Sequence, residues 1–159
     1  MKIQQLTLLF FLLTLVSCNR TVHDDSGFLP GVKIPPGNYN TTIRLNDAPE
    51  FLNSHKNGEV LLLQIINLSN TTIAFPSDYG FKLFTNRDGK WVDVPNNTFY
   101  AGSTLYLPTK SAWPSGLTAN IMPYMAGLKS SVSVRVIVIG HKKDSNEEVG
   151  AYLDITINP

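Results

Sequence analysis

The sequence predicts an all-β protein whose strands pack as an antiparallel β-sandwich. Short runs rich in β-branched and aromatic residues are separated by turn signals made of Gly, Pro, Asn and Asp. No segment repeats apolar residues at helical spacing. About seven to nine strands in a chain of this length fit a sandwich better than a mixed fold, and a small closed β-barrel is the alternative.

Three strands are expected in the first half of the domain, over residues 41–45, 59–67 and 71–75. The second is apolar at nearly every position, which predicts a central strand covered on both faces. A single short turn is expected at residues 54–58. The clearest local signal follows, a hairpin that pairs residues 81–85 with residues 91–94. Its connection contains Asp-Gly, and both residue types accept the positive φ that a tight reversal requires.

The second half of the domain contains two short expected strands, over residues 104–107 and 117–122, and two long ones, over 132–139 and 151–157. In each long strand apolar residues alternate with polar ones. This alternation predicts one face on the core and one face in solvent. The charged segment 141–148 is expected to connect them as a hairpin.

The N-terminus has the composition of an export signal. Lys2 precedes an apolar run, and the stretch from Ile3 to Ser17 is 15 residues long. That is shorter than the roughly 20 residues needed to span a hydrocarbon core, so residues 1–17 are predicted to be a cleaved signal peptide. No later apolar stretch approaches that length, and we expect membrane contact through lipid alone.

The tetrapeptide Leu-Val-Ser-Cys at residues 15–18 resembles the lipobox of bacterial lipoproteins. The resemblance implies that Cys18 receives a diacylglycerol and becomes the first residue of the mature chain. Acylation would also remove an unpaired thiol from an oxidising compartment, because Cys18 is the only cysteine. An ordinary signal peptide cut nearby is the alternative. Asn19 replaces the aspartate of inner-membrane retention, which favours the outer membrane if the cell is Gram-negative; otherwise the cell surface is expected.

Residues 18–38 are expected to form the lipidated N-terminus and a flexible tether, because they lack apolar periodicity and contain several Pro and Gly residues. The domain is then expected over residues 39–159. Residues 60–75, 88–95 and 148–157 resemble the immunoglobulin-like domains of small bacterial surface and secreted lipoproteins. Such domains serve adhesion, display or scaffolding and share no catalytic site, so the resemblance implies no functional residues.

Charge and motifs exclude several functions. Loss of Lys2 with the signal leaves 12 basic and 12 acidic side chains, a balance that does not favour nucleic acid. The phosphate-binding loops and the usual serine-nucleophile motifs are absent. His23, His55 and His141 lack metal-ligand spacing and are interpreted as solvated. Asp144 and Asn146 are spaced as in a calcium loop, but glycine is missing from its sixth position. We expect no metal and no cofactor.

Two sets of residues remain as candidates for modification or binding. Asparagines in the Asn-x-Ser/Thr pattern are interpreted as turn residues rather than glycan acceptors. Aromatic and sulfur side chains gather in the irregular middle of the chain, where they either plug one end of the sandwich or form a platform for a sugar or peptide. The candidate ligand-binding residues are Tyr100, Trp113 and Tyr124, with Phe99, Tyr106, Met122 and Met125 nearby in sequence; the asparagines are Asn19, Asn40, Asn67, Asn70 and Asn96.

The sequence therefore predicts a lipid-anchored cell-envelope protein that acts as a binding, adhesion or structural module and is not an enzyme. Its expected partner is an envelope protein or a glycan. One alternative is an accessory subunit of a larger envelope complex, in which an exposed strand such as residues 41–45 accepts a partner strand. The other is a small hydrolase whose site is assembled from distant residues.

Overall fold

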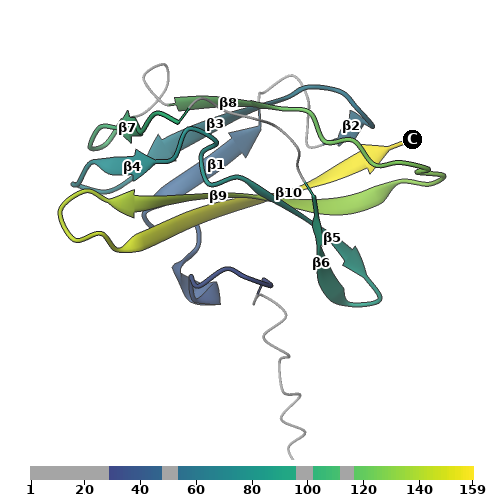
Figure 1. Ribbon diagram of the computed structural model, residues 1–159, viewed down its shortest axis with the longest axis horizontal. Coiled ribbons are helices and arrows are strands. Elements are labelled where there is room, and N and C mark those ends of the chain that lie inside the picture. The colour runs from purple at the N-terminus through teal and green to yellow at the C-terminus, as the bar shows by residue number, and fades with distance from the viewer. Residues whose placement is uncertain (1–28, 48–53, 96–101, 112–116) are drawn as a thin grey trace, which may run out of the picture.

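The computed structural model describes residues 29–47, 54–95, 102–111 and 117–159. Within these ranges the chain is an all-β sandwich of two sheets, which remain open and do not close into a barrel (Figure 1). A short 3-10 helix, η1, covers Pro36–Asn38. The strands are β1 (Ile43–Asp47), β2 (Ser54–Lys56), β3 (Leu61–Asn67), β4 (Ile73–Phe75), β5 (Lys82–Arg87), β6 (Lys90–Val94), β7 (Leu105–Leu107), β8 (Leu117–Ile121), β9 (Val132–Lys142) and β10 (Glu148–Asn158).

One sheet has the strand order β1-β3-β8 and the other the order β2-β10-β9-β4-β7, with β5 pairing β9 and β6 pairing β5. The long hairpin of β9 and β10 runs in register from His141 opposite Glu148 to Val132 opposite Ile157. Every pair is antiparallel except β2 with β10, which is parallel. The predicted sandwich is therefore confirmed, and its expected antiparallel pairing has one exception.

The main core lies between the two sheets and follows the predicted alternation. Val134, Val136 and Val138 of β9 are fully buried in it, as are Ala151 and Ile157 of β10. In β3, however, only alternate residues are buried: Leu61, Leu63 and Ile65 face the core, whereas Leu62 is 38% exposed. The expectation that this strand is covered on both faces is therefore wrong for the described residues.

Strands β4 and β5 are two parts of one line of pairing along β9. Ala74 pairs with His141, and Lys82 pairs with Ile137. Between these two pairs the chain of β4 and β5 advances by eight residues, whereas β9 advances by only four. The four extra residues form a bulge that ends at Gly80. Gly80 has a φ of +57°, and a Cβ built there would lie 2.3 Å from the carbonyl oxygen of Ile139. Only glycine fits this close approach of two backbones.

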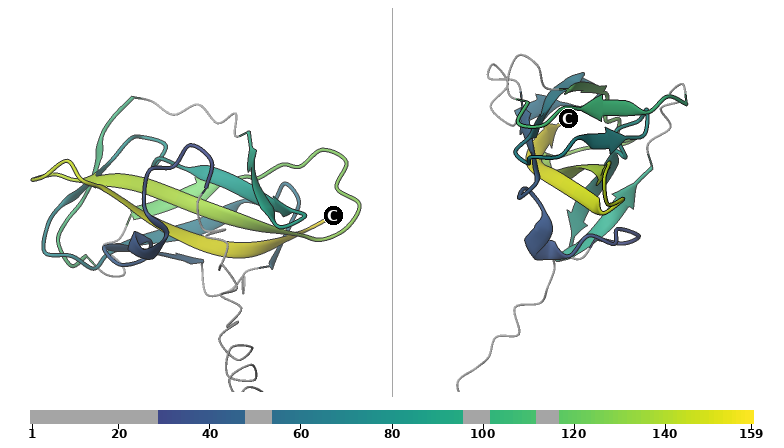
Figure 2. Two further views of the ribbon diagram at one scale, coloured as in Figure 1. Left: turned by 90° about the horizontal axis from the view of Figure 1, so that it is seen from below. Right: turned by 90° about the vertical axis from the view of Figure 1, so that its left-hand side faces the viewer.

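A second, smaller core lies on the outer face of the seven-stranded sheet. Seen from below in Figure 2, the N-terminal segment 29–39 lies across β9 and β10. Its apolar side chains are buried together with outward-facing residues of β5 and β9. The buried members of this cluster are Leu29, Val32, Ile34, Tyr39, Phe84 and Ile137.

This packing corrects the expected tether. Residues 29–38 are part of the packed domain, and only their upstream neighbours fall outside the described residues. Asn40 extends the attachment, because its amide N–H donates to the carbonyl of Gly150 and its side-chain oxygen accepts from the amide of Tyr152. Within the described residues, the packed domain therefore includes the segment from Leu29 to residue 38, which was expected to be a tether.

Candidate functional site

Of the three candidate ligand-binding residues, the structure describes only Tyr124. Cys18, Tyr100 and Trp113 lie outside the described residues. Tyr124 is 70% exposed and lines a groove at one end of the sandwich. Two stretches of chain form the walls of this groove.

The first wall is the loop that connects β8 to β9, and Asn57 holds it in place. The Asn57 side chain donates to the carbonyl of Met125 and accepts from the amide of the same residue, both at 2.9 Å. The amide of Gly58 also donates to the carbonyl of Pro123 at 3.0 Å. One asparagine thus imitates a strand pair, and the wall is fixed before any ligand arrives.

The second wall is the β5–β6 hairpin where it leaves the sheet. Asp88 and Gly89 have φ values of +53° and +80°, the tight reversal predicted from the sequence, and the side chain of Asn86 accepts from the amide of Gly89 at 3.0 Å. The pairing of β5 with β9 ends where Thr85 lies opposite Val134. Beyond this point the hairpin extends away from β9, as Figure 1 shows.

A groove of about 500 Å³ lies between the walls, which is within the usual size range of ligand sites. Its apolar lining is continuous with the main core, because Val94, Met125, Leu128 and Val132 are half-buried and pack against that core. The full lining is Thr85, Asn86, Arg87, Val94, Pro95, Tyr124, Met125, Ala126, Gly127, Leu128, Lys129, Ser130, Ser131 and Val132.

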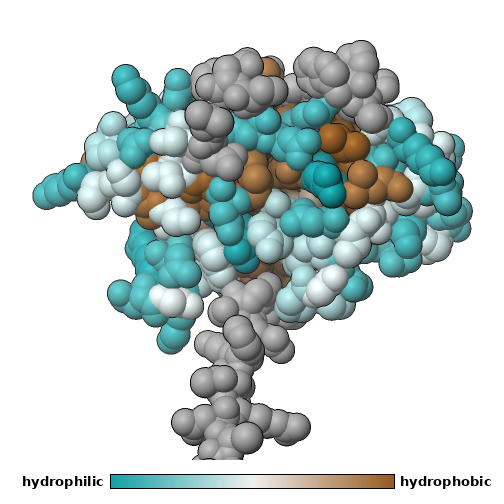
Figure 3. All heavy atoms as spheres, turned by 180° about the vertical axis from the view of Figure 1, so that it is seen from behind, coloured by the Kyte–Doolittle hydropathy of each residue, from teal (hydrophilic) through white to brown (hydrophobic). Residues whose placement is uncertain are grey.

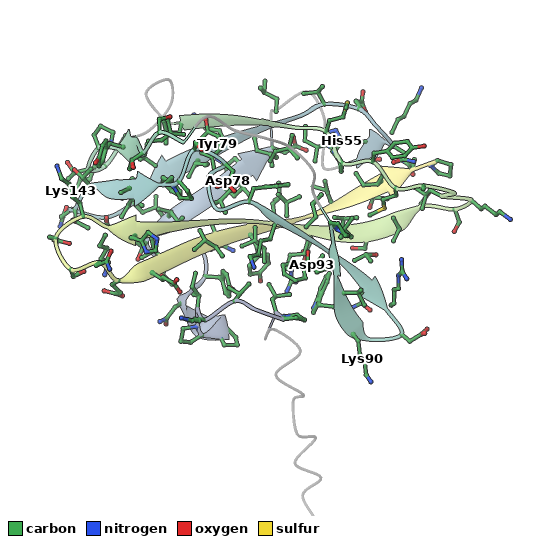
Figure 4. All side chains as sticks on the ribbon, viewed as in Figure 1. His55, Asp78, Tyr79, Lys90, Asp93 and Lys143 are labelled. Carbon is green, nitrogen blue, oxygen red and sulfur yellow. The ribbon has the colours of Figure 1, made fainter. Side chains whose placement is uncertain are left out.

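The charged residues that line the groove are both cations. Arg87 and Lys129 are exposed, and no Asp or Glu is among the lining residues. Within the described residues neither cation forms a salt bridge. At the tip of the hairpin, Lys90 points away from the sheet (Figure 4). The groove is therefore locally positive in a chain whose overall charge is close to neutral.

Arg135, a cation of β9, is held very differently. The guanidinium of Arg135 lies 4.3 Å from the ring centre of Trp91 and 4.1 Å from that of Tyr152. It also donates two hydrogen bonds to Asp154, at 2.7 and 2.8 Å. Burial alone lowers the pKa of Arg135, but the hydrogen bonds and charge of Asp154 outweigh it, so that pKa is raised. This arginine is a structural clamp.

Tyr39 borders the same clamp. Its ring meets that of Tyr152 edge to face at 5.6 Å, and its hydroxyl has no hydrogen-bond partner among the described residues. Burial raises the pKa of the Tyr39 hydroxyl to about 12, while the charge of Arg135 acts to lower it and that of Glu148 to raise it. A cavity of only about 100 Å³ remains here, room for about three waters.

The histidines do not form a catalytic or metal site in the part of the chain that the structure describes. His55 is 1% exposed, which corrects the solvated position expected for it. Its Nε2 lies 2.8 Å from a carboxylate oxygen of Asp47, and its Nδ1 lies 3.9 Å from Glu59 (Figure 4). No cluster of metal-ligating side chains occurs among the described residues. The pair of His55 and Asp47 joins β2 to β1 inside the fold.

The candidate glycan acceptors differ in their accessibility. Asn67 is 1% exposed, and its Nδ2 donates to the carbonyls of Thr71, Leu107 and Pro108. This nitrogen is the atom a glycan would require, so Asn67 is a structural residue in the folded chain. Asn70 is exposed, while Asn19 and Asn96 lie outside the described residues.

The rest of the surface offers scattered apolar side chains. Figure 3 shows, on the face seen from behind, hydrophobic residues between hydrophilic ones. No helix among the described residues is long and apolar enough to cross a membrane. The exposed large apolar residues are Val60, Leu62, Leu68, Val92, Tyr106, Met122 and Tyr124.

Comparison with known proteins adds no functional assignment. The chain matches no protein-family model, and no curated protein matches its sequence. The groove and the N-terminal sequence are therefore the features that bear on function.

Sequence reasoning found Tyr124 but missed the two cations. Arg87 lies in the predicted hairpin and Lys129 precedes a predicted strand, 42 residues further along the chain. The available signal was weak: Lys129 has no acidic residue within ten positions in the sequence, but Arg87 is followed directly by Asp88. Their approach depends on the divergence of β5 from β9, which no local pattern reveals.

Proposed function

We propose that this protein is a lipid-anchored binding module of the bacterial cell envelope and that the groove is its binding site. The anchor is supported by the lipobox-like segment at residues 15–18 and by the solitary Cys18. Leu29, a packed residue of the domain, lies only eleven residues after Cys18. At no more than about 3.5 Å per residue, the domain stays within about 40 Å of the headgroups.

The observation that carries the binding role is a groove with preset walls and uncompensated charge. Asn57 and the hairpin turn fix its walls without a ligand, so ordering them adds little cost to binding. Two exposed cations beside an apolar floor provide a polar and an apolar means of recognition. This combination is typical of sites for ligands with both charged and apolar groups.

The strand order supports an immunoglobulin-like relationship. Such sandwiches pair strands A, B and E in one sheet and C, F and G in the other. Here β1-β3-β8 takes the places of A, B and E, while the interrupted strand β4 and β5, then β9 and β10, takes those of C, F and G. Loops at the ends of these sandwiches commonly carry binding residues, and the groove lies at such an end.

The anchoring proposal is tested by replacing Cys18. The Cys18→Ser chain should lose the acyl mass on its N-terminal fragment and leave the membrane fraction, because several acyl chains provide the stable attachment. Ser17→Ala, which keeps a small residue before the cysteine, should remain in the membrane fraction. Unchanged partitioning of Cys18→Ser would refute the anchor.

A second candidate, the accessory subunit, is favoured by β1. Within the described residues this strand pairs only with β3, so its other edge is open. Site-specific photo-crosslinkers separate the two candidates in intact cells. A probe at Lys129 should capture a defined partner if the groove is the binding site, whereas a probe at Arg44 should capture it if β1 receives a partner strand. Capture only at Arg44 would reject the groove.

A further inference from the structure

We infer that the groove recognises an extended, acidic peptide segment of a partner protein. This inference rests on the proposed role of the groove as the binding site and specifies the chemical class of its ligand. Its supports are the two stretches of chain that line the groove, the open backbone positions in the loop wall, the sign of the charge and the position of the apolar floor.

Two stretches of chain line the groove. One wall is the run from Tyr124 to Val132, which turns at Ala126 and Gly127, and the other is formed by the adjoining ends of β5 and β6. Backbone on both sides suits a peptide that lies between the two walls. Extended peptides bind in this way when they lie beside strands and loops with open backbone groups.

The loop wall provides such open positions. Lys129 and Ser130 line the groove, and within the described residues their backbone groups form no backbone hydrogen bond. Their N–H and C=O groups are therefore available to the backbone of a bound peptide.

The charge selects the sign of the ligand. Arg87 and Lys129 stand on opposite walls, and no acidic side chain lines the groove between them. Two cations are too few to hold a polyanion such as nucleic acid, whose affinity depends on many phosphate contacts. They suit one or two carboxylates, and an arginine can bind a carboxylate through two parallel hydrogen bonds.

The floor accounts for the remaining side chains of the ligand. Leu128, Val94 and Val132 are half-buried against the main core and are exposed in part along the groove. In an extended peptide successive side chains point to opposite sides. One set would then rest on the apolar floor while the other presents its carboxylates to Arg87 and Lys129. The expected ligand alternates acidic and apolar residues.

The test is selection from a displayed library of random short peptides on the full-length chain purified from bacterial cells. The native chain should enrich Asp and Glu at alternating positions. The double variant Arg87→Glu with Lys129→Glu should lose these peptides and enrich Lys and Arg instead. The matched control is Lys33→Glu with Lys110→Glu, which makes the same change of charge at exposed positions outside the groove. It should select the same peptides as the native chain.

A second measurement tests the backbone contact. The most enriched peptide is synthesised with N-methyl groups at every second residue, in each of the two possible frames. One frame should weaken binding by about tenfold or more, because it removes the N–H groups that reach the wall, and the other frame should have little effect. Equal affinity of both methylated peptides and the parent would contradict strand-like binding.

The outcomes separate this inference from the proposed function. Selection without acidic enrichment, or unchanged selection by the double variant with its circular dichroism spectrum intact, would overturn the inference. If a Lys129 probe still captures a partner in cells, the groove remains the binding site and only the ligand class is wrong. If acidic peptides are selected but Cys18 carries no lipid, the inference stands and the anchor does not.

Discussion

The β5–β6 hairpin holds its neighbouring cations in opposite ways on its two faces. On the closed face, which is turned toward the second core, Arg135 is enclosed by Trp91 and Tyr152 and bound through two hydrogen bonds to Asp154. On the open face, which lines the groove, Arg87 is exposed, and no acidic residue lines the groove. A guanidinium that is stacked and paired has its donors and faces occupied, so it stabilises the fold. An unpaired one keeps them available for a ligand.

The difference arises from what covers the sheet. On the closed face the segment 29–39 packs on β9 and β10 beside the rings around Arg135. On the open face β5 no longer pairs with β9 near the turn, and the loop from Tyr124 to Val132 stands apart from the hairpin. One hairpin thus contributes both to the stability of the sandwich and to the candidate site.

The largest expected effect on stability comes from distorting the bulge that leads into β5. Gly80→Ala adds a Cβ where the carbonyl oxygen of Ile139 already lies and imposes a side chain at positive φ. We expect a loss of about 3 kcal/mol in the free energy of unfolding. Urea denaturation measures it. Gly102→Ala is the control, because its added Cβ meets no atom within 4 Å; equal losses in both variants would contradict the tight approach of β5 to β9.

The contacts on the closed face of the hairpin are tested by Arg135→Ala. This change removes two cation–π contacts and a bidentate pair, of which Asp154 is partly exposed. The expected loss is about 2 kcal/mol in the free energy of unfolding, most of it from the ring contacts. Trp91 fluorescence follows the transition directly. A loss as small as that of an exposed surface substitution would show that the clamp adds nothing.

Tyr39, which packs beside the closed face, makes the stability of the fold depend on pH. In the unfolded chain its hydroxyl ionises near pH 10, whereas in the folded protein the pKa is about 12. Between these values unfolding releases a proton, so the free energy of unfolding falls as the pH rises from about 10 to about 12. Below pH 10 both states are protonated and nothing is lost. Tyr39→Phe should flatten this part of a stability profile measured by denaturation at successive pH values; an unaltered slope would refute it.

The smallest effect on stability is expected on the open face, which lines the groove. Arg87→Ala combined with Lys129→Ala should change the free energy of unfolding by no more than about 0.5 kcal/mol, because both side chains are exposed and unpaired within the groove. The same variant should lose binding of acidic peptides, measured by fluorescence anisotropy. A loss of stability comparable to that of Arg135→Ala would place these cations in the fold rather than in the site.

Much of the fold was predictable because its strands show their burial directly in the sequence. The alternation in β9 and β10 predicted their core faces, and Asp-Gly predicted the turn between β5 and β6. Strand β2 was missed, since its three residues are polar and exist as a strand only through pairing with β10. Local pattern has no access to such a partner.

The covered outer face was missed although one signal was present. Along β9 the outward positions change from polar, at Ser133 and Arg135, to apolar, at Ile137 and Ile139. That change indicates a second buried surface, and the apolar residues Leu29 and Val32 upstream were available to cover it. The prolines and glycines around them favoured a linker instead. For the site, sequence supplied the exposed aromatic Tyr124, while the meeting of Arg87 and Lys129 required the three-dimensional fold.

The packed N-terminal segment also determines how the domain would respond to mechanical load. Any tension applied upstream of Leu29 is received first by the buried side chains of Leu29, Val32 and Ile34. Asn40 then passes it to β10 through its two hydrogen bonds with Gly150 and Tyr152. A pull from the N-terminus is thus distributed over the longest hairpin of the protein before it reaches the end of any single strand.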